Sequence, residues 1–366
     1  MKRLKDRKDA KRIDNIDGLA QLSIDLKPNR SVSDVYINQK MDLTKLVDYV
    51  NEKKKKNKDF TIFHTFVAAT AKTIYNRPKL NRFVANRHLY EHNDVIISFV
   101  AKVAFTDHSE EMMILVPIDP EDTVDTISEK IKDKVTSLRN NKGTKSGANS
   151  AVDTLGKLPN IIRVPVVGLL KWLDKKGHLP QSLCDDNIYY SSIILSNLGS
   201  IHCGAIFHNI NDFGACSSLA TMGEIKDEIV IENGKQKIKK LCEFGINLDE
   251  RIADGYYFAK SVKLLQHIFD NPKLLEDAAS KEIDMEEIRW LHGNHLFLFK
   301  YLLICWCFTI SISACTTGNA IPVGVKISST YRALRKSLNV PSAAIAHIIF
   351  STTLKFTIIS SFKNCL

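Results

Sequence analysis

Apolar residues recur at helical spacing in several stretches of the chain. This pattern predicts amphipathic helices over residues 42–51, 60–75, 125–138 and 256–269. Asp42 comes just before the first apolar face and is the predicted N-cap of that helix. The second helix is expected to end at the segment Asn76-Arg77-Pro78, because proline disfavours helical geometry in the residue before it.

Shorter apolar runs, several of them alternating with polar residues, predict strands between these helices. The Asn233-Gly234 dipeptide predicts a hairpin turn, with one strand before it and another beginning near Ile238. Strands and helices alternate without a regular repeat, which indicates an α/β fold. No glycine-rich phosphate loop follows a strand, so nucleotide-binding folds are disfavoured. The expected strands before the hairpin are 35–37, 95–105, 112–117, 188–197, 217–222 and 229–231.

Three regions differ in composition. Residues 1–34 are charged and poor in large apolar side chains, so we expect a basic N-terminal arm on the surface, with order beginning near Val35. Residues 35–289 have the composition of a globular domain. Residues 290–366 contain no acidic residue, and their apolar run 296–314 approaches the length of a bilayer span. Two interpretations of this tail stay open: a membrane anchor, and an unstructured appendage.

A second apolar segment, residues 161–173, lies within the stretch 152–183 and carries basic residues near its end. One interpretation is a helical insertion packed on the domain. The other is a helix that lies in the interface of a membrane. Both segments, 161–173 and 296–314, are therefore candidates for membrane contact.

The positive charge of the chain is concentrated near its ends. The formal net charge is +10, but residues 1–12 hold seven Lys/Arg against two Asp, and residues 290–366 hold seven against none. The intervening body is close to neutral, and its one basic run, Lys53 to Lys58, is typical of a solvated helix end. A groove that follows nucleic-acid phosphates needs clustered charge inside the folded body, so we expect no nucleic-acid partner.

The eight cysteines include no C-x-x-C pair, which disfavours a structural zinc site. Residues 1–12 lack the apolar core of a secretory signal, so we expect reduced thiols and a cytoplasmic protein. A membrane-associated form stays open through the two apolar segments. We expect no metal ligands.

Two short polar segments end predicted strands and are the candidates for chemistry. The first is Leu-Ser-Asn-Leu-Gly-Ser at residues 195–200. The second is Gly-Ile-Asn-Leu-Asp-Glu-Arg-Ile-Ala-Asp-Gly at residues 245–255, which runs into a predicted helix. Polar groups at strand ends are positions where a rigid sheet can present catalytic atoms.

Together and in this order, the two segments resemble the catalytic domain of the acyltransferase component of 2-oxo acid dehydrogenase complexes, which shares its fold with chloramphenicol acetyltransferase. That family has an S-N-L-G segment at the end of a core strand and, later in the chain, a D-H-R-x-x-D-G motif. Here the second motif reads Asp249-Glu250-Arg251-Ile252-Ala253-Asp254-Gly255. The resemblance extends from about Val35 to Leu275.

The resemblance implies an α/β two-layer sandwich of a mixed β-sheet and helices, assembled as a homotrimer. Coenzyme A or acyl-CoA is the implied substrate, and the site lies in a channel between subunits. The acyl group and the acceptor cannot be inferred from the sequence. Ser196 is the implied donor to the tetrahedral oxyanion.

The family also implies roles for the residues around these two groups. Asn197 and Gly199 are implied to bind substrate, and Arg251 is implied to be structural. Asp254 is implied to hold its loop through a buried ion pair, and Gly255 to permit a tight entry into the following helix.

The sequence departs from the family at the motif histidine, which is the general base and is replaced by Glu250. A free glutamate near pKa 4.3 would take a proton from a thiol near 8.5, which is uphill by about 5 to 6 kcal/mol. Burial of Glu250 would narrow this gap. Pairing of Glu250 with a lysine or arginine, without catalysis, is the alternative. His202 and His208 follow the serine strand and are candidate substitute bases, although loop histidines are more often surface residues.

Two further departures concern the surroundings of the site. The 34 residues before the domain are too few for a lipoyl domain, so we expect a free-standing protein without a covalent lipoyl group. Residues 140–187 form an insertion that is atypical of the family and precedes the serine strand. The predicted function is a coenzyme A-dependent acyltransferase of this type. The alternative is a catalytically inactive trimeric binding or scaffold protein with the same fold.

Overall fold

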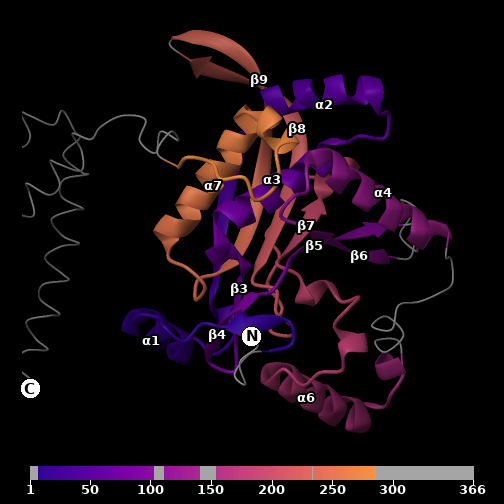
Figure 1. Cartoon of the computed structure of the whole chain (residues 1–366), viewed down its shortest axis with the longest axis vertical. Coiled ribbons are helices and arrows are strands. Elements are labelled where there is room, and N and C mark those ends of the chain that lie inside the picture. Colours follow the sequence, from indigo (N-terminus) through magenta and orange to yellow (C-terminus); the bar gives the residue numbers. More distant parts are fainter. Residues whose placement is uncertain (1–6, 103–110, 141–153, 233, 286–366) are drawn as a thin grey trace, which may run out of the picture. The chain divides into compact units, whose positions relative to one another are not determined.

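A six-stranded mixed sheet lies at the centre of the computed structural model, which describes residues 7–102, 111–140, 154–232 and 234–285 (Figure 1). The strand order is β2-β9-β8-β7-β5-β6. β7 runs parallel to β5 and to β8, and the other pairs are antiparallel. The strands are β2 (Asp34–Asp42), β5 (Val95–Lys102), β6 (Glu111–Ile118), β7 (Ile193–Asn197), β8 (Ser218–Glu232) and β9 (Lys235–Asp249).

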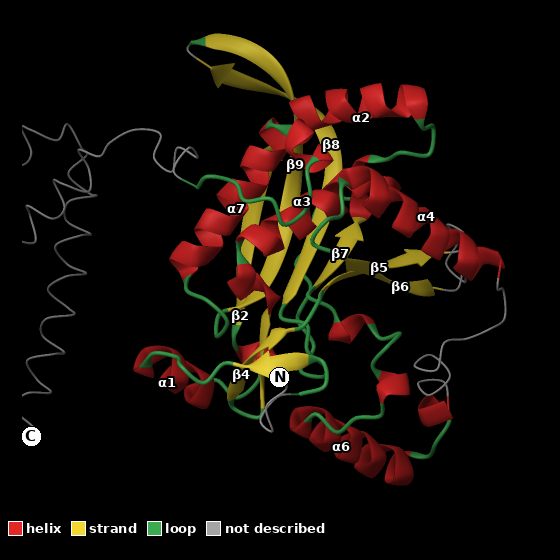
Figure 2. Cartoon of the chain, viewed as in Figure 1, coloured by secondary structure: helices red, strands yellow, loops and turns green. Residues whose placement is uncertain are grey.

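Helices form a second layer, and Figure 2 shows α3, α4 and α7 lying across one face of the sheet. Aromatic side chains join the layers: the rings of Phe66 and Phe244 lie 5.3 Å apart, and those of Phe244 and Phe269 lie 5.8 Å apart. The predicted class, α/β with a mixed sheet covered by helices, is therefore confirmed. The helices beside the main sheet are α2 (Thr44–Lys56), α3 (Ile62–Asn76), α4 (Val124–Asn140) and α7 (Gly255–Asp270).

A smaller assembly lies beside the main sheet. Its three strands, in the order β1-β4-β3, are antiparallel and pack with α6 around a second group of buried apolar residues. The elements of this region are β1 (Ala10–Arg12), α1 (Gly18–Leu26), β3 (Arg82–Ala85), β4 (His88–His92) and α6 (Asn160–Lys176). Short 3₁₀ helices connect elements at Arg30–Val32, Pro78–Asn81, Gln181–Leu183, Ile188–Tyr190, Leu198–Ile201 and Pro272–Glu276.

The prediction that order begins near Val35 is wrong. Residues before it form β1 and α1, and Arg7, Ile24 and Arg30 are almost completely buried. The two arginines are buried because other segments supply their hydrogen-bond acceptors, including the Asp174 carbonyl for Arg7 and the Gly214 carbonyl for Arg30. Composition alone does not reveal such long-range partners.

Several predicted boundaries also change. The helix expected over 42–51 is α2, which continues to Lys56. Asp42 ends β2 and accepts hydrogen bonds from the amide and hydroxyl of Thr44. The strand expected over 188–197 starts only at Ile193, after a 3₁₀ turn. The strand expected over 217–222 continues to Glu232, because β8 and β9 form one long hairpin.

Two predicted regions lie wholly or partly outside the described residues. These are the insertion up to residue 153 and the tail 290–366 with its apolar run 296–314. Every described residue belongs to the unit Met1–Trp290. The expected helix in the insertion is confirmed for Asn160–Lys176. Among the described helices, none combines the length and apolarity that a membrane crossing requires.

Candidate active site

Ser196 lies at the C-terminal end of β7, where the chain leaves the sheet. The parallel pairing of β7 with β8 places Ser196 opposite Thr221. The chain then enters the 3₁₀ turn Leu198–Ile201. Ser196 and Asn197 are half-buried, as expected for polar groups at the rim of a sheet.

Gly199 is required by the packing of this turn. A Cβ atom at Gly199 would lie 2.5 Å from the carbonyl oxygen of Gly223, a contact that real structures do not tolerate. The turn after Ser196 therefore lies directly against the backbone of β8. This close approach fixes the position of Ser196 through the backbone alone.

The two candidate substitute bases are on the surface, as the sequence suggested. The side chain of His202 is 85% exposed, and its Nδ1 lies 2.7 Å from the carboxylate of Glu224. The hydrogen bond from His202 lowers the pKa of Glu224. His208 is also exposed, and its ring lies near the carbonyl of Asn209.

Glu250 directly follows the last residue of β9. Its amide donates a 3.0 Å hydrogen bond to the carbonyl of Ser33, and its carboxylate forms an ion pair with Lys27. The Glu250 side chain is 36% exposed in a single copy of the chain. The sequence suggested a lysine or arginine partner as one alternative, and the structure supplies one from the N-terminal region.

A buried ion pair fixes the loop that carries Glu250. Two nitrogens of Arg251 lie 2.8 and 2.6 Å from the two carboxylate oxygens of Asp249, and both side chains are inaccessible to solvent or nearly so. Arg251 also donates to the carbonyl of Lys27 at 2.8 Å. A two-pronged arginine–carboxylate contact of this kind restricts orientation as well as adding energy.

The buried ion pair predicted for Asp254 is not formed within a single copy of the chain. Asp254 is exposed and caps α7, where its carboxylate accepts a 2.8 Å hydrogen bond from the amide of Tyr257. Among the described residues, the buried ion pair of this loop joins Arg251 to Asp249 instead. Gly255 also lacks the role predicted for it, since a Cβ there meets no atom within 4 Å and its φ is not positive.

The strand register places Ser196 level with the middle of β2, and Glu250 just past the C-terminal end of β9. Ser196 pairs with Thr221, and Thr221 pairs with Gly245 on β9. Glu250 lies five residues beyond Gly245, which is about 16 Å along the strand and about 10 Å across two strands, or roughly 19 Å in total. A proton acceptor and an oxyanion donor must both reach one reacting centre, so a single copy cannot use both residues together.

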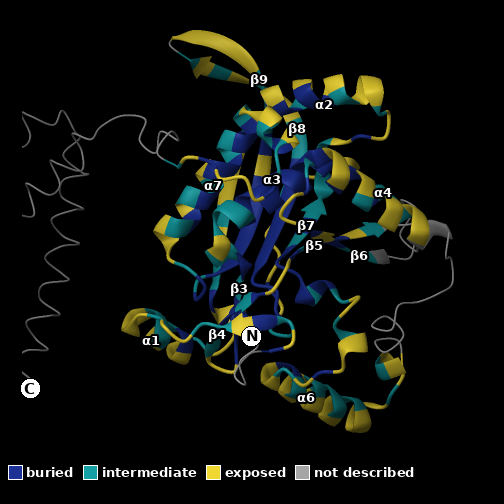
Figure 3. Ribbon diagram, in the orientation of Figure 1, coloured by how far each residue is buried: buried dark blue, intermediate teal, exposed yellow. Residues whose placement is uncertain are grey.

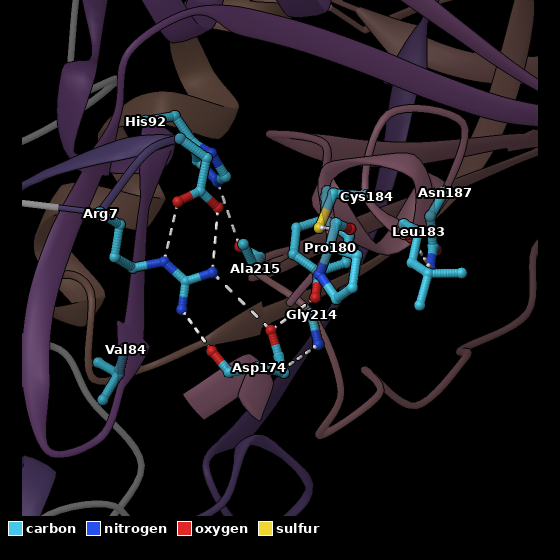
Figure 4. Close-up of polar contacts among 12 residues, drawn as sticks. Arg7, Val84, His92, Asp174, Pro180, Leu183, Cys184, Asn187, Gly214 and Ala215 are labelled. Carbon is cyan, nitrogen blue, oxygen red and sulfur yellow. Dashed lines mark hydrogen bonds and ion pairs between the residues drawn. The ribbon is translucent and has the colours of Figure 1, made fainter. Parts of the chain in front are cut away.

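A buried polar cluster that no sequence pattern indicated joins three distant segments (Figure 4). Arg7 contacts the carboxylate of Asp9 at 2.9 and 3.1 Å and the carbonyl of Asp174 at 2.7 Å. The carboxylate of Asp174 accepts from the Tyr190 hydroxyl at 2.6 Å and from the Gly214 amide at 2.9 Å. The cluster therefore ties the N-terminal region and the end of α6 to the body.

A cavity of about 30 Å³ lies next to the Glu250 loop. Its lining includes Arg30, Arg87, Lys175 and Arg251, together with two aspartates. Among the described residues, no group of three or more histidine, cysteine, aspartate or glutamate side chains is arranged to hold a metal ion. The four cysteines in this part of the chain are free thiols.

Comparison with known proteins gives only structural similarities. No protein-family model matches the chain, and no curated protein sequence matches it. A probable dihydrolipoamide acetyltransferase from Listeria monocytogenes is 18% identical, with a TM-score of 0.48, and the match covers 71% of this chain and 95% of that one. A truncated catalytic core of the 2-oxoacid dehydrogenase multienzyme complex from Thermoplasma acidophilum is 16% identical, with a TM-score of 0.45. The match covers 72% of this chain and 99% of that one.

A chloramphenicol acetyltransferase is 9% identical, with a TM-score of 0.45, and the match covers 71% of this chain and 99% of that one. These neighbours are the kinds of protein that the two motifs resemble. With such identities and with TM-scores below 0.5, the similarity does not decide the activity, substrate or assembly of this chain. Those depend on its own residues.

Proposed function

We propose that the chain is a coenzyme A-dependent acyltransferase of the 2-oxo acid dehydrogenase type, with active sites formed between two copies. The observation that carries this proposal is the placement of the two motif segments. Each ends a core strand in a tightly fixed loop, yet the strand register separates Ser196 from Glu250 by five residues along β9 and by two strand spacings. If one copy supplies Ser196 and another supplies Glu250, both the fixed positions of the loops and the distance between them are explained.

In the proposed reaction, the Glu250 carboxylate takes the proton of an acceptor thiol or hydroxyl as that group attacks the thioester carbonyl of acyl-CoA. The tetrahedral oxyanion accepts a hydrogen bond from the Ser196 hydroxyl of the other copy. Collapse breaks the carbon–sulfur bond, and the coenzyme A thiolate recovers the proton from Glu250. The carboxylate that would accept this proton is the one ion-paired with Lys27.

The proposed assembly is a homotrimer, and the hairpin of β8 and β9 supports association. The first part of β9, from Lys235 to Lys240, does not pair with β2, and here the hairpin projects past the rest of the sheet (Figure 2). Ile229, Ile231 and Ile238 on this projection are 67%, 75% and 71% exposed. Such apolar exposure on an extended ribbon is typical of a surface that a partner covers.

The Lys27–Glu250 ion pair favours a second candidate, a trimeric binding or scaffold protein without catalysis. In that case the carboxylate is held by the lysine for structural reasons and never accepts a substrate proton. Both candidates keep the expected cytoplasmic location and, from the charge distribution, the expectation of no nucleic-acid partner. They differ in whether acyl-CoA is turned over.

The test uses the purified full chain with a panel of acyl-CoAs, and follows release of free thiol. Acceptors are dihydrolipoamide, small amines and small alcohols, and Ser196→Ala is the matched control. We expect turnover with at least one combination and, by light scattering, a mass three times that of the chain. Trimers without turnover would favour the scaffold protein, and a monomer would overturn the site between copies.

A further inference from the structure

Helix α6 exposes large apolar side chains on its outer face. Figure 3 shows the helix at the periphery of the described region, with much of its surface exposed. In most helices of a folded domain the apolar face is turned toward the core, so this pattern is unusual. The side chains concerned are Ile161 (84% exposed), Ile162 (50%), Val164 (66%), Leu169 (56%) and Trp172 (55%).

The inner face of α6 is held firmly against the body. Leu170 and Leu173 pack on the second apolar core, and Asp174 is buried. Asp174 accepts hydrogen bonds from Tyr190 and Gly214 and lies 3.8 Å from a guanidinium nitrogen of Arg7 (Figure 4). A rotation that hid the outer face would break these contacts, so the apolar face is fixed outward.

Charge on the outer face has one sign. Asp174 is the only acidic residue in α6, and it is buried, whereas Lys171, Lys175 and Lys176 are exposed near the C-terminal end. At 100° per residue, Ile161 and Trp172 fall on one line along the helix, with lysines on either side of it. Val164, Leu169 and Ile162 lie further round the same side, so the lysines emerge among exposed apolar side chains. A helix face that combines apolar and cationic groups is typical of a helix that lies in a membrane interface.

Helix α1 provides an internal comparison. It exposes Leu19, Leu22 and Leu26, yet it has no basic residue and contains Asp25. Apolar exposure alone is therefore not peculiar to α6. The combination of apolar and cationic groups is what distinguishes it and selects an anionic surface.

We propose that α6 binds the surface of an anionic lipid bilayer, with its axis in the plane of the membrane. The stripe around Ile161 and Trp172 enters the boundary between headgroups and acyl chains, and the lysines contact lipid phosphates. At 17 residues the helix is about 25 Å long, shorter than the hydrocarbon core, so it lies on the bilayer and does not cross it. A second copy is a poorer occupant, since α6 packed on α6 offers the lysines no acidic partner: the one acidic residue of the helix, Asp174, is buried.

The test is flotation of the full chain with vesicles of phosphatidylcholine alone or mixed equally with phosphatidylglycerol. We expect binding to the anionic vesicles, and at least about tenfold weaker binding for Ile161→Glu/Trp172→Glu. The matched control, Leu19→Glu/Leu22→Glu in α1, should bind like the wild type. Replacing Lys171, Lys175 and Lys176 by glutamine leaves the apolar stripe intact and should weaken binding roughly a hundredfold at low salt.

Three outcomes would overturn the proposal. The first is equal binding by the wild type and both α6 variants, which would assign any membrane contact to another segment, such as residues 296–314. The second is equal binding to neutral and anionic vesicles. The third is a changed oligomeric mass in the α6 variants, because the face would then be a contact between copies. Circular dichroism confirms the fold of each variant, and the lysine variant stays informative if the glutamate variant misfolds.

Discussion

The ends of two strands, β7 at Ser196 and β9 at Glu250, hold their motif residues in different ways. At the Ser196 end, the backbone does the positioning, through the close approach of Gly199 to Gly223. At the Glu250 end, buried charges do it, through Arg251 and Asp249. The N-terminal region takes part only at the second end, where the carbonyl of Lys27 accepts from Arg251 and its side chain pairs with Glu250.

Because of this difference, we expect a change at Ser196 to affect the reaction alone, and a change in the Glu250 loop to affect folding stability as well. Ser196 is half-buried at a strand end and can lose its hydroxyl without leaving a buried charge. The Glu250 loop depends on an ion pair that is almost inaccessible to solvent, so changes around it affect stability as well as reaction. The contacts of Lys27 with Glu250 and Arg251 also show that residues before Val35 contribute to this loop.

The largest effect is expected from Glu250. If Glu250 is the base, Glu250→Gln should lower the rate of acyl transfer by about 10² to 10⁴. Glu250→His, made together with Lys27→Gln so that no cation opposes imidazole protonation, should retain or raise the rate. Steady-state thiol release measures both variants. Equal rates for wild type and Glu250→Gln would remove Glu250 from proton transfer and direct attention to His202.

Ser196→Ala is expected to lower acyl transfer by about 10² to 10³, through loss of one donor to the oxyanion. Its melting temperature should match that of the wild type, because the turn is held by Gly199 and not by the hydroxyl. Ser200→Ala is the matched control, since that hydroxyl bonds to the carbonyl of Asn197 and is exposed. Unchanged turnover in Ser196→Ala would exclude the serine from the mechanism.

Arg251→Met tests the charge-based positioning at the Glu250 end. It leaves Asp249 buried without its cation and should lower the free energy of unfolding by about 3 to 5 kcal/mol. Arg82→Met is the control, because its ion pair with Glu91 is partly exposed and is worth under about 1 kcal/mol. Urea unfolding measures both, and similar losses in the two variants would contradict the comparison between the ends.

The pH dependence of stability should arise away from both ends. Burial, with a smaller contribution from Lys132, lowers the pKa of His64 from 6.5 to about 4. Below pH 6.5 the unfolded chain takes up a proton that folded His64 does not, so stability falls as the pH drops toward 4. The contribution of His64 to the loss at pH 5 is about 2 kcal/mol relative to pH 7. His92, whose pKa burial also lowers to about 4, contributes separately.

His64→Gln should remove the contribution of His64, because it keeps an acceptor for the amide of Thr61 at the start of α3 but does not titrate. Urea unfolding at pH 7 and pH 5 measures the difference. An unchanged pH dependence in His64→Gln would assign the acid sensitivity to another group. Comparing wild type with His64→Gln at pH 5 also shows whether a loss of activity in acid is caused by unfolding.

The sequence predicted the elements whose signal is local. Helical periodicity located α2, α3, α4 and α7, and the Asn233-Gly234 dipeptide located the long hairpin. The two motif segments were also evident, because each is a short run of residues at a strand end. Local patterns suffice for these features because helix faces and turns depend on neighbouring residues.

The contacts around the site were not predictable, because they join distant parts of the chain. Nothing in the sequence pairs Lys27 with Glu250, or Arg7 with Asp174. The charge of the first 34 residues suggested a solvated arm, whereas several of these charges are satisfied inside the fold. The buried ion pair that the family pattern implied for Asp254 is also not formed within a single copy, where Asp254 is exposed.

Mixing of two inactive variants tests the shared site most directly. Ser196→Ala and Glu250→Gln are co-expressed in equal amounts, and the purified mixed assemblies are assayed for acyl transfer. If one copy supplies Ser196 and another supplies Glu250, random assembly keeps both groups intact in about one site in four, so about a quarter of wild-type activity should return. Activity no higher than that of the separate variants would contradict a site shared between copies.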